Sequence, residues 1–409
     1  MQQAWRVIGI LGFTQIMSWG ALYYAFGVLA PAIRQALGLP SELIYGAFSW
    51  AILVAGLAAT PVGMAIDRIG GRYVMAAGSL ACGGGLMWLG HCDGAGAYFG
   101  AWTLLGLGMA LSLYEAAFAT INRKADDGGR QAISTLTLFG GFASTIFWPL
   151  TAQLNAALGW RQTYLCYAAV QLLLCLPLHL LLGKDGARQR LTAVNGAARA
   201  HTLGEALRHP AFWTLAGAFA ANALIFSALS VHLLPLIQDF GHAASLAVLL
   251  LTLIGPMQVV GRLLERLWAH RVTPQLVGQL TFATLPAAIL VLLLFGSQAW
   301  AVSLFCVLYG LSNGVLTILR GTLPQALFGR EHYGAISGAM AGPALLAKAA
   351  GPLAAAMVLR AHGEPTLLLW GLLAIAGGAL LLYWHAHGQR ASAAGVAEGL
   401  QARAGWPSS

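Results

Sequence analysis

Twelve long apolar stretches recur along this 409-residue chain, and they constrain its fold more than any other feature. Each comes close to the roughly 20 residues that a helix needs to cross the ~30 Å hydrocarbon core of a bilayer. They span residues 7–30, 43–66, 73–91, 97–121, 132–157, 162–183, 211–236, 244–268, 274–296, 299–320, 333–358 and 365–386. We therefore expect an all-α membrane protein with twelve transmembrane helices, because helices satisfy their own backbone hydrogen bonds in lipid.

Composition excludes the soluble alternatives. Charged residues make up 9% of the chain and hydrophobic residues 58%, whereas a typical soluble domain has about 25% charged residues. So few charges would leave large apolar patches exposed on a soluble protein of this size. The net charge of +9 lies mostly in short connections between apolar stretches. We therefore expect a lipid bilayer around the chain and no nucleic-acid partner.

The distribution of basic residues predicts the orientation in the membrane. If the N-terminus is cytoplasmic, about 18 Lys and Arg residues fall on the cytoplasmic side. Arg34, Arg161 and Arg360 then fall on the outer side. Since short cytoplasmic loops carry an excess of Lys and Arg, we expect a multi-pass protein of the cell (inner) membrane with both termini cytoplasmic.

The longest polar connection separates six apolar stretches from six. We expect an N-terminal half at 1–183, a cytoplasmic linker at 184–210, a C-terminal half at 211–387 and a flexible tail at 388–409. The halves share short sequences in the same order: Thr-Ile-x-Arg at 120–123 and 317–320, Ala-Ile-Ser at 132–134 and 335–337, and Pro-Leu at 149–150 and 352–353. Such a repeat is typical of secondary transporters, which bind substrate between two related halves.

The sequence Gly-Met-Ala-Ile-Asp-Arg-Ile-Gly-Gly-Arg at 63–72 follows the second apolar stretch. It resembles the G-x-x-x-D-R-x-G-[RK]-[RK] loop of the major facilitator superfamily, which connects helices 2 and 3 on the cytoplasmic side. The resemblance covers nearly the whole chain and implies two six-helix halves that rock around a central site. It also implies a cytoplasmic gate made of Gly63, Asp67, Arg68, Gly71 and Arg72. The alternative is an ordinary anchoring loop.

The second half carries a degraded counterpart of this loop. In one register, Arg266 takes the glycine position and His270 the aspartate position. In the other, Gly261 and Glu265 take these positions. We favour the first register because the second would end the eighth helix early.

Lys348 lies in the middle of the eleventh apolar stretch, about 22 Å along the helix from residue 333. A charge at this depth costs ~2.5–3.5 kcal/mol on the insertion scale, so it needs a water-filled cavity or a counter-ion. We expect Lys348 to bind substrate. The alternative is a structural ion pair with a carboxylate on a neighbouring helix.

Arg262 lies inside the eighth apolar stretch. Together with Lys348, it resembles the cation pair of the monocarboxylate transporter and oxalate–formate exchanger branches of the superfamily. That resemblance implies that both cations hold a substrate carboxylate. Arginine suits bidentate binding of a carboxylate, and lysine supplies a point charge. The alternative for Arg262 is an ion pair with Glu265.

Glu115 lies near the cytoplasmic end of the fourth apolar stretch and is a candidate proton carrier. The alternative is a fixed salt bridge, with Lys348 or Arg262 as its partner. His232, near the outer end of the seventh stretch, is a second titratable candidate, although a hydrogen-bonded histidine in the core is the alternative. Further candidates for lining a substrate cavity, or for packing between helices, are Gln15, Trp19, Tyr23, Tyr24 and Asn313.

The sequence contains no Walker A motif and no catalytic or metal-binding constellation, so we expect no cofactor, no metal and no enzymatic activity. Our interpretation is a monomeric secondary active transporter of a small organic anion, a mono- or dicarboxylate, that a proton could accompany. Two embedded cations favour an anion as the small-molecule partner. The first alternative is an exporter of drugs, metalloids or other toxic solutes on the same fold. The second is a membrane sensor that transports nothing.

Overall fold

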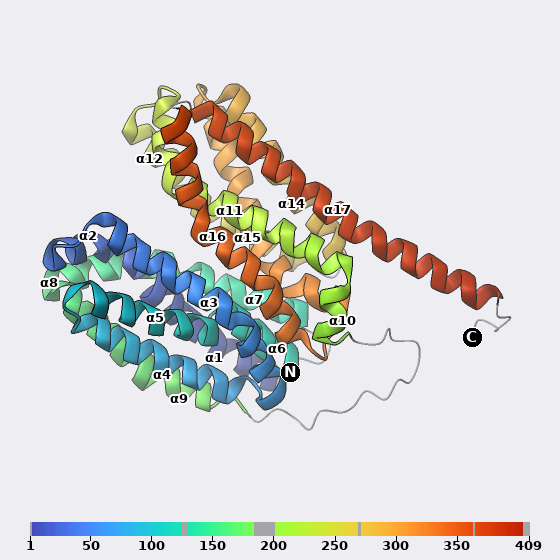
Figure 1. Cartoon of the computed structure of the whole chain (residues 1–409), viewed down its shortest axis with the longest axis horizontal. Coiled ribbons are helices and arrows are strands. Elements are labelled where there is room, and N and C mark those ends of the chain that lie inside the picture. Colours follow the sequence, from blue (N-terminus) through green and yellow to red (C-terminus); the bar gives the residue numbers. More distant parts are fainter. Residues whose placement is uncertain (1, 125–128, 184–200, 269–270, 363–364, 404–409) are drawn as a thin grey trace.

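The computed structural model describes residues 2–124, 129–183, 201–268, 271–362 and 365–403, and this part of the chain is helical without strands (Figure 1). The first group of helices comprises α1 (Gln2–Trp19), the π-helix η1 (Gly20–Tyr24), α2 (Ala25–Leu37), α3 (Ser41–Ile69), α4 (Gly71–Gly90), α5 (Gly94–Ser112), α6 (Tyr114–Lys124), α7 (Gly129–Gly141), α8 (Ala143–Val170), the π-helix η2 (Gln171–Cys175) and α9 (Leu176–Leu180). The second group comprises α10 (Leu203–Arg208), α11 (Pro210–Asp239), α12 (Ala244–Leu251), α13 (Ile254–Trp268), α14 (Pro274–Phe295), α15 (Ala299–Phe328), α16 (Tyr333–His362) and α17 (Pro365–Arg403).

Among the described residues, eleven helical stretches are long and apolar enough to cross a membrane. One of them, Gly129–Leu180, covers 52 residues and contains two of the twelve predicted helices. The chain turns back at Gly159, which has φ 81° and ψ 165° inside α8. The hydroxyls of Thr151 and Tyr167 consequently lie 2.7 Å apart, whereas a straight helix would separate them by about 24 Å. The predicted all-α fold with twelve membrane helices is confirmed.

The predicted end of the tenth helix is wrong. We ended the tenth apolar stretch at Arg320, but α15 continues to Phe328. The helix tolerates the arginine because Arg320 forms an ion pair with Glu115. Its end comes instead at Gly329, whose φ of 85° is open to glycine but strained for other residues. Arg320 therefore lies inside the helix bundle and not in a connecting loop.

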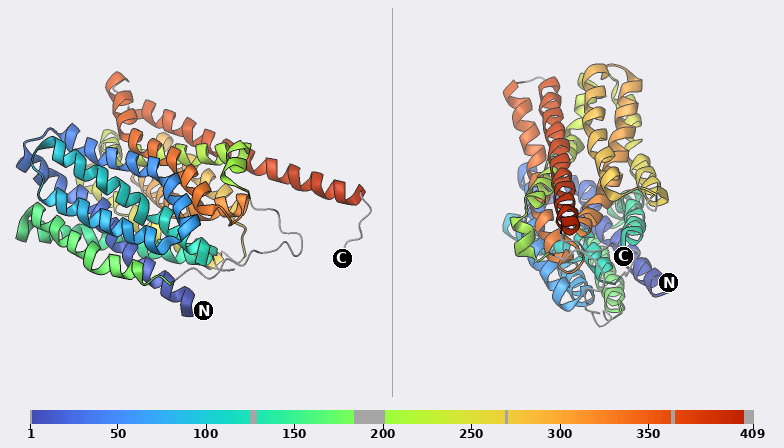
Figure 2. Two further views of the ribbon diagram at one scale, coloured as in Figure 1. Left: turned by 60° about the horizontal axis from the view of Figure 1, so that its bottom comes forward. Right: turned by 90° about the vertical axis from the view of Figure 1, so that its right-hand side faces the viewer.

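The two groups of helices converge at one end of the molecule and splay apart at the other. Figure 1 shows them meeting near α6 and α10, while α2 and α12 lie far from each other at the opposite end. In the right-hand view of Figure 2, the yellow-to-red helices lie above the blue-to-green ones. We call the end where Gly63 and Asp67 contact Gly334 and Ala335 the closed end. The opposite end, which carries α2 and α12, is the open end.

The boundaries of the four expected segments remain predictions. The expected linker, 184–210, contains α10 at its end, and residues 184–200 lie outside the described residues. The side chain of Thr202 accepts a hydrogen bond from the backbone of Glu205, whose own side chain bonds back to Thr202, so α10 begins with a capping box. α17 continues as a helix through Arg403, into the segment expected to be a flexible tail.

Candidate functional site

A pocket lies between the two groups of helices, at a point where two helices lose their regular geometry. The first irregularity is η1, one π-helical turn that carries Tyr23. The second is Leu113, whose extended backbone, with φ −81° and ψ −164°, separates α5 from α6. Both π turns and broken membrane helices recur at functional sites, because they redirect side chains and free backbone groups. These two breaks place Tyr23, Tyr114 and Glu115 around the same space.

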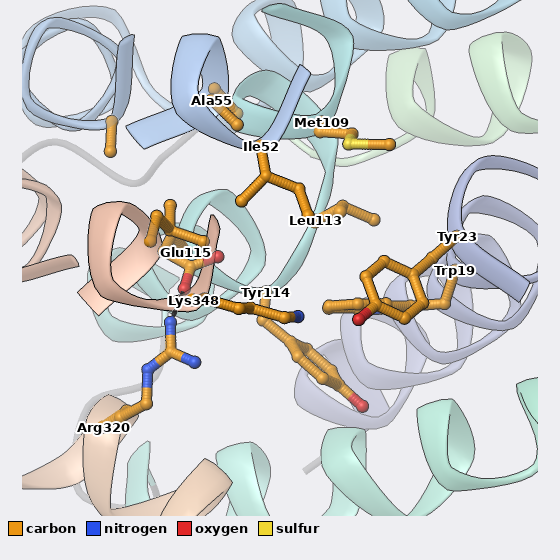
Figure 3. A pocket seen from close by; sticks show the side chains of 13 residues that line it. Trp19, Tyr23, Ile52, Ala55, Met109, Leu113, Tyr114, Glu115, Arg320 and Lys348 are labelled. Atoms are coloured by element: carbon orange, nitrogen blue, oxygen red, sulfur yellow. Dashed lines mark hydrogen bonds and ion pairs between the residues drawn. The ribbon is translucent and has the colours of Figure 1, made fainter. Parts of the chain in front are cut away.

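Lys348 projects into this pocket from α16 (Figure 3). Its Nζ lies 4.3 Å from the ring centroid of Tyr23 and 5.9 Å from that of Trp19. Both distances are within the range of a cation–π contact. No acidic side chain pairs with Lys348 in the part of the chain that the structure describes. Its ammonium group is therefore available to an anion that enters the pocket.

Glu115 and Arg320 form an ion pair on the same pocket, drawn as a dashed line in Figure 3. Glu115 comes from the first turn of α6 and Arg320 from the middle of α15, so the pair links the two groups of helices. Their side chains are 23% and 32% exposed, which shows that the pair is open to solvent. The alternative of a salt bridge for Glu115 is thus observed, but the predicted partners, Lys348 and Arg262, were wrong.

Arg320 is the residue that the sequence analysis missed. The Thr-Ile-x-Arg repeat matched it to Arg123, which lies one residue before the end of α6. That match suggested a cytoplasmic position for Arg320 too. No signal in the sequence indicated otherwise, because Gly321 and Pro324, residue types that commonly end helices, closely follow Arg320 although α15 continues through both of them to Phe328.

The rest of the pocket is apolar or aromatic. The pocket encloses about 560 Å³, including space that is open to solvent. Besides the residues already named, its lining comprises Ile52, Ala55, Ala59, Met109, Ala110, Leu113 and Leu345. Tyr114 lies with its ring centroid 5.1 Å from that of Trp19, and Trp19 in turn contacts Tyr23 at 5.5 Å. The three rings form an aromatic wall beside Lys348.

Other predicted cavity residues lie outside this lining. Gln15 is fully buried, where it donates to the carbonyl of Ser112 and accepts from Trp19. The hydrogen bond from the indole nitrogen of Trp19 to Gln15 fixes the orientation of the Trp19 ring. Tyr24 faces Trp148 and the edge of Tyr23. Asn313 is half-buried on α15, one helical turn before Thr317, whose hydroxyl donates to its carbonyl.

Two predicted polar residues also lie apart from the pocket lining. His232 contacts the carbonyl of Pro352 through Nε2 at 3.1 Å and joins α11 to α16. Arg262 is 7% exposed, and one guanidinium nitrogen donates to the carbonyl of Thr137 on α7 at 2.9 Å. Arg262 therefore bridges the two groups of helices, and the structure does not bring it together with Lys348 as a pair of pocket cations.

The first contact between the two groups at the closed end joins α3 to α16, and we call it seam A. A side chain at Gly63 would overlap the carbonyl oxygen of Gly334, so the two backbones are in contact. The Asp67 carboxylate accepts hydrogen bonds from the backbone N–H groups of Gly334 and Ala335, at 3.0 and 2.8 Å. These groups have no partner within their own helix, because they lie in the first turn of α16. Asp67 thus caps a helix of the other group and meets the positive end of its dipole.

The remaining residues of the 63–72 sequence contribute less directly. A side chain at Gly71 would overlap Thr120, so this glycine permits tight contact between α4 and α6. Arg72 lies over the ring of Tyr73 at 5.2 Å. Arg68 is exposed, and no hydrogen bond or ion pair involves it within the described residues. The guanidinium that supports Asp67 is that of Arg123, which donates to the backbone carbonyls of Ile66 and Asp67.

A second contact at the closed end joins α7 to α13, and we call it seam B. Arg130 pairs with the buried Glu265 at 2.8 Å and also donates to the carbonyl of Val272 at 2.7 Å. Ser134 donates to the other oxygen of Glu265. The next residue along each helix also contributes, because Arg266 donates to the hydroxyl of Thr135. Seam B therefore consists mainly of contacts between side chains of α7 and α13.

Seam B corrects the register that we favoured for the second half. Glu265 stands four residues after Gly261 and contacts Ser134, just as Asp67 stands four residues after Gly63 and contacts Ala335. Glu265 occurs three residues before the end of α13, and Asp67 two residues before the end of α3. Helix length therefore does not disfavour this register. His270 lies outside the described residues.

Comparisons with known proteins agree with this architecture. The sequence profile of the Major Facilitator Superfamily matches residues 8–352. No curated protein sequence matches the chain significantly. The human organic anion transporter MFSD10 (TETRAN) shares the fold at 16% identity with a TM-score of 0.70, over 93% of this chain and 99% of that chain. The E. coli fucose:proton symporter FucP shares it at 14% identity with a TM-score of 0.72, over 93% of this chain and 98% of that chain. The proton:xylose symporter XylE shares it at 12% identity with a TM-score of 0.69, over 94% of this chain and 96% of that chain.

The profile match covers well over half of the chain. The similar structures extend over more than nine-tenths of it and have the same fold. The two related groups of helices, with a pocket between them, agree with both findings. This chain is a membrane transporter, not an enzyme, and it belongs to the major facilitator superfamily.

Proposed function

We propose that this chain is a secondary active transporter of small organic anions, of the mono- or dicarboxylate class, and that Lys348 binds the substrate carboxylate. The observation that carries the proposal is the position of the Lys348 ammonium, on an open pocket and without an acidic partner among the described residues. An embedded cation is costly when the pocket is empty, and a bound anion offsets that cost. Trp19 and Tyr23 hold the ammonium in place.

The closed and open ends suggest which step of the cycle the structure represents. By the positive-inside argument, the closed end faces the cytoplasm, where both termini lie. The pocket then opens to the outside of the cell membrane, and seams A and B form the cytoplasmic gate. A gate on one side and an opening on the other is what alternating access between two halves requires.

Similar proteins support the substrate class and the coupling. MFSD10 is described as an organic anion transporter, and FucP and XylE as proton symporters of sugars. In this chain, Glu115 is the pocket residue that could carry a proton, since its side chain is partly exposed and paired with a single arginine. His232 contacts a backbone carbonyl outside the pocket lining, so we assign it no part in the coupling.

The alternative, an exporter of drugs or other toxic solutes, draws support from the apolar and aromatic lining. An apolar neutral compound would fit such walls as well as an anion would. The two functions differ in what they require of Lys348, because a cationic or neutral substrate gains nothing from the ammonium group.

A thermal-shift screen of the detergent-purified monomer tests this function. The ligands are carboxylates, inorganic anions, amino acids and cationic drugs, each with wild type, Lys348→Ala and the control Arg34→Ala. Arg34 is exposed near the open end and bonds only Ser41 among the described residues. A ligand at about 100 times its Kd stabilises by about 2.7 kcal/mol. We expect carboxylates to stabilise wild type and Arg34→Ala but not Lys348→Ala. Equal stabilisation of all three by drugs alone would support the exporter instead.

A further inference from the structure

Three charged side chains line the pocket, and their balance sets what the pocket can accept. Lys348 and Arg320 contribute two positive charges and Glu115 one negative charge. Arg320 is already committed to Glu115, whereas Lys348 is not paired with an acid among the described residues. The empty pocket therefore carries one positive charge without a counter-ion, and one neutral ion pair next to it.

The surroundings of these charges are apolar. Trp19, Tyr23 and Tyr114 form one wall, and Ile52, Met109 and Leu345 contribute to the rest. Each methylene that a ligand buries against such walls strengthens binding about fourfold. A small polar dianion would leave these walls in contact with water. A carboxylate with an aromatic or branched apolar body would cover them.

Building on the proposed function, we propose that this pocket selects carboxylates with an apolar body. We also propose that the Glu115–Arg320 pair makes the binding of a dianion, but not that of a monoanion, depend on the uptake of a proton. A monoanion binds to Lys348 and leaves the pair intact. A dianion binds only together with one proton from solvent, which converts the Glu115 carboxylate to the neutral acid and releases the Arg320 guanidinium for the second carboxylate. One bound anion and one bound proton then restore the same net charge as a monoanion alone.

The geometry around Glu115 supports this exchange. The pair joins α6 to α15 on the wall of the pocket, and both side chains are partly open to solvent. A proton and a carboxylate can therefore reach it without breaking into a sealed core. The guanidinium can accept a carboxylate in bidentate fashion, which suits the second acidic group of a dianion.

Several other charged or titratable groups lie around Glu115, and each has a defined position. Tyr333 on α16 lies within electrostatic range of Glu115, Arg320 and Asp67. Tyr114, next to Glu115, lies within range of Arg262. Lys348 and Tyr23 line the same pocket as Glu115, and the ammonium group of Lys348 points toward Tyr23. Asp67 is bonded to the backbone of α16 and Arg262 to the backbone of α7, so Arg320 is the cation that pairs directly with Glu115.

The experiment compares two probes that differ by one carboxylate, phenylacetate and phenylmalonate. Isothermal titration of the full-length protein at one pH, in two buffers with different ionisation enthalpies, gives the number of protons taken up with each ligand. The pH is chosen so that phenylmalonate is a dianion in solution. We expect no proton uptake with phenylacetate and about one proton per phenylmalonate. Equal proton uptake for the two probes would show that the pair does not distinguish a dianion from a monoanion.

Two variants sharpen the test. Glu115→Gln leaves Arg320 unpaired, so phenylmalonate should bind it without proton uptake. The double variant Glu115→Gln/Arg320→Gln removes the pair but keeps the net charge of the pocket. Relative to wild type, it should weaken the binding of phenylmalonate at least about tenfold more than the binding of phenylacetate. Equal losses for both probes in the double variant would show that the pair merely supports the fold.

The outcome separates this inference from the function on which it rests. If small aliphatic carboxylates bind but phenylacetate does not, the assignment of an apolar body is wrong and the anion transporter remains. If no carboxylate binds to wild type while Lys348→Ala behaves identically, both the inference and the proposed function are wrong.

Discussion

Seams A and B lie side by side at the closed end, yet they hold the two groups of helices together by different means. In seam A, the backbones of α3 and α16 touch at Gly63, and a single carboxylate, Asp67, bonds to backbone N–H groups. In seam B, α7 and α13 are held by side chains, with Glu265 between Arg130 and Ser134. The repeat thus gives both carboxylates equivalent positions and different partners.

The difference follows from which helix the glycine of each seam contacts. Gly63 lets the backbone of α16 come close enough for its free N–H groups to reach Asp67. Gly261 contacts Leu311 within its own group of helices, so it brings no partner backbone to Glu265. In seam B, the side chains of Arg130, Ser134 and Arg266 make the contacts instead. We therefore expect seam A to depend on shape and seam B on charge.

The largest effect should come from filling the glycine contact of seam A. In Gly63→Leu, the side chain would meet the backbone of Gly334, which cannot move without displacing α16. Overpacking of this kind costs about 3 kcal/mol, which corresponds to a shift of more than about 100-fold against the closed end. We expect transport to be nearly abolished. The distance between spin labels at Tyr73 and Gly204, in a Cys166→Ser background, should increase.

Gly27→Ala is the matched control for this prediction. Gly27 is also a glycine in a membrane helix, but a side chain there would meet nothing within 4 Å. It should leave both the label distance and transport unchanged. Cys166 is replaced because it is exposed, whereas the other four cysteines are buried. A Gly63→Leu protein with the wild-type label distance would show that seam A is not tightly packed.

The next effect should come from removing the carboxylate of seam B. In Glu265→Gln, Arg130 loses its ion pair, and Arg262 and Arg266 remain nearby without a negative charge. The side chain of Glu265 is 1% exposed and that of Arg130 19%. Breaking a pair of this kind should cost about 2 kcal/mol, less than for a fully buried pair. The closed–open equilibrium constant should shift about 30-fold away from the closed conformation, and high salt should change this shift only weakly.

The same labels measure this effect. Arg266→Gln serves as the control, since it removes a neighbouring positive charge and relieves repulsion around Arg130. If Glu265→Gln and Arg266→Gln open the closed end equally, then hydrogen bonding and not the ion pair stabilises seam B.

A smaller effect should follow from Asp67→Asn in seam A. The asparagine side chain keeps one oxygen that accepts from Gly334 or Ala335 but loses the charge that meets the helix dipole. We expect a cost of about 1 kcal/mol and thus about a fivefold shift of the closed–open equilibrium constant away from the closed conformation. Asp67→Asn should therefore open the closed end less than Glu265→Gln does. The reverse order would mean that the charge of Asp67 contributes more than the backbone contact around it.

The fold was largely predictable because only helices and closed barrels satisfy the backbone hydrogen bonds of a chain inside a lipid bilayer. The twelve apolar stretches and the Gly63–Arg72 motif predicted the helices and the superfamily, including a turn between residues 157 and 162 that the structure places at Gly159, whereas the end of α15 was not predicted. The sequence pattern treated Arg320 as the end of a helix. It could not reveal that Glu115, 205 positions earlier, supplies the counter-charge.

The candidate site was predictable only in part. Lys348, Trp19, Tyr23 and Glu115 do line one pocket, and each could be recognised in the sequence as a polar or aromatic residue within an apolar stretch. Arg262 does not, because the partner that determines its position, the carbonyl of Thr137, is a backbone group that any residue would provide. The sequence does not show which backbone carbonyl a side chain will contact, because every residue has one.

Arg68 should give the smallest effect of the four changes, although it stands beside Asp67 in the same sequence motif. Its side chain is exposed and makes no hydrogen bond or ion pair with another described residue in this conformation. Exposed residues without partners change stability by about 0.5 kcal/mol or less, so Arg68→Ala should leave the label distance of the closed end unchanged. Arg123→Ala is the informative contrast, because Arg123 supports the end of α3 through the carbonyls of Ile66 and Asp67. If Arg68→Ala slows transport while the closed end stays intact, Arg68 acts in the opposite conformation, where seam A is broken and Asp67 has lost the N–H groups of α16.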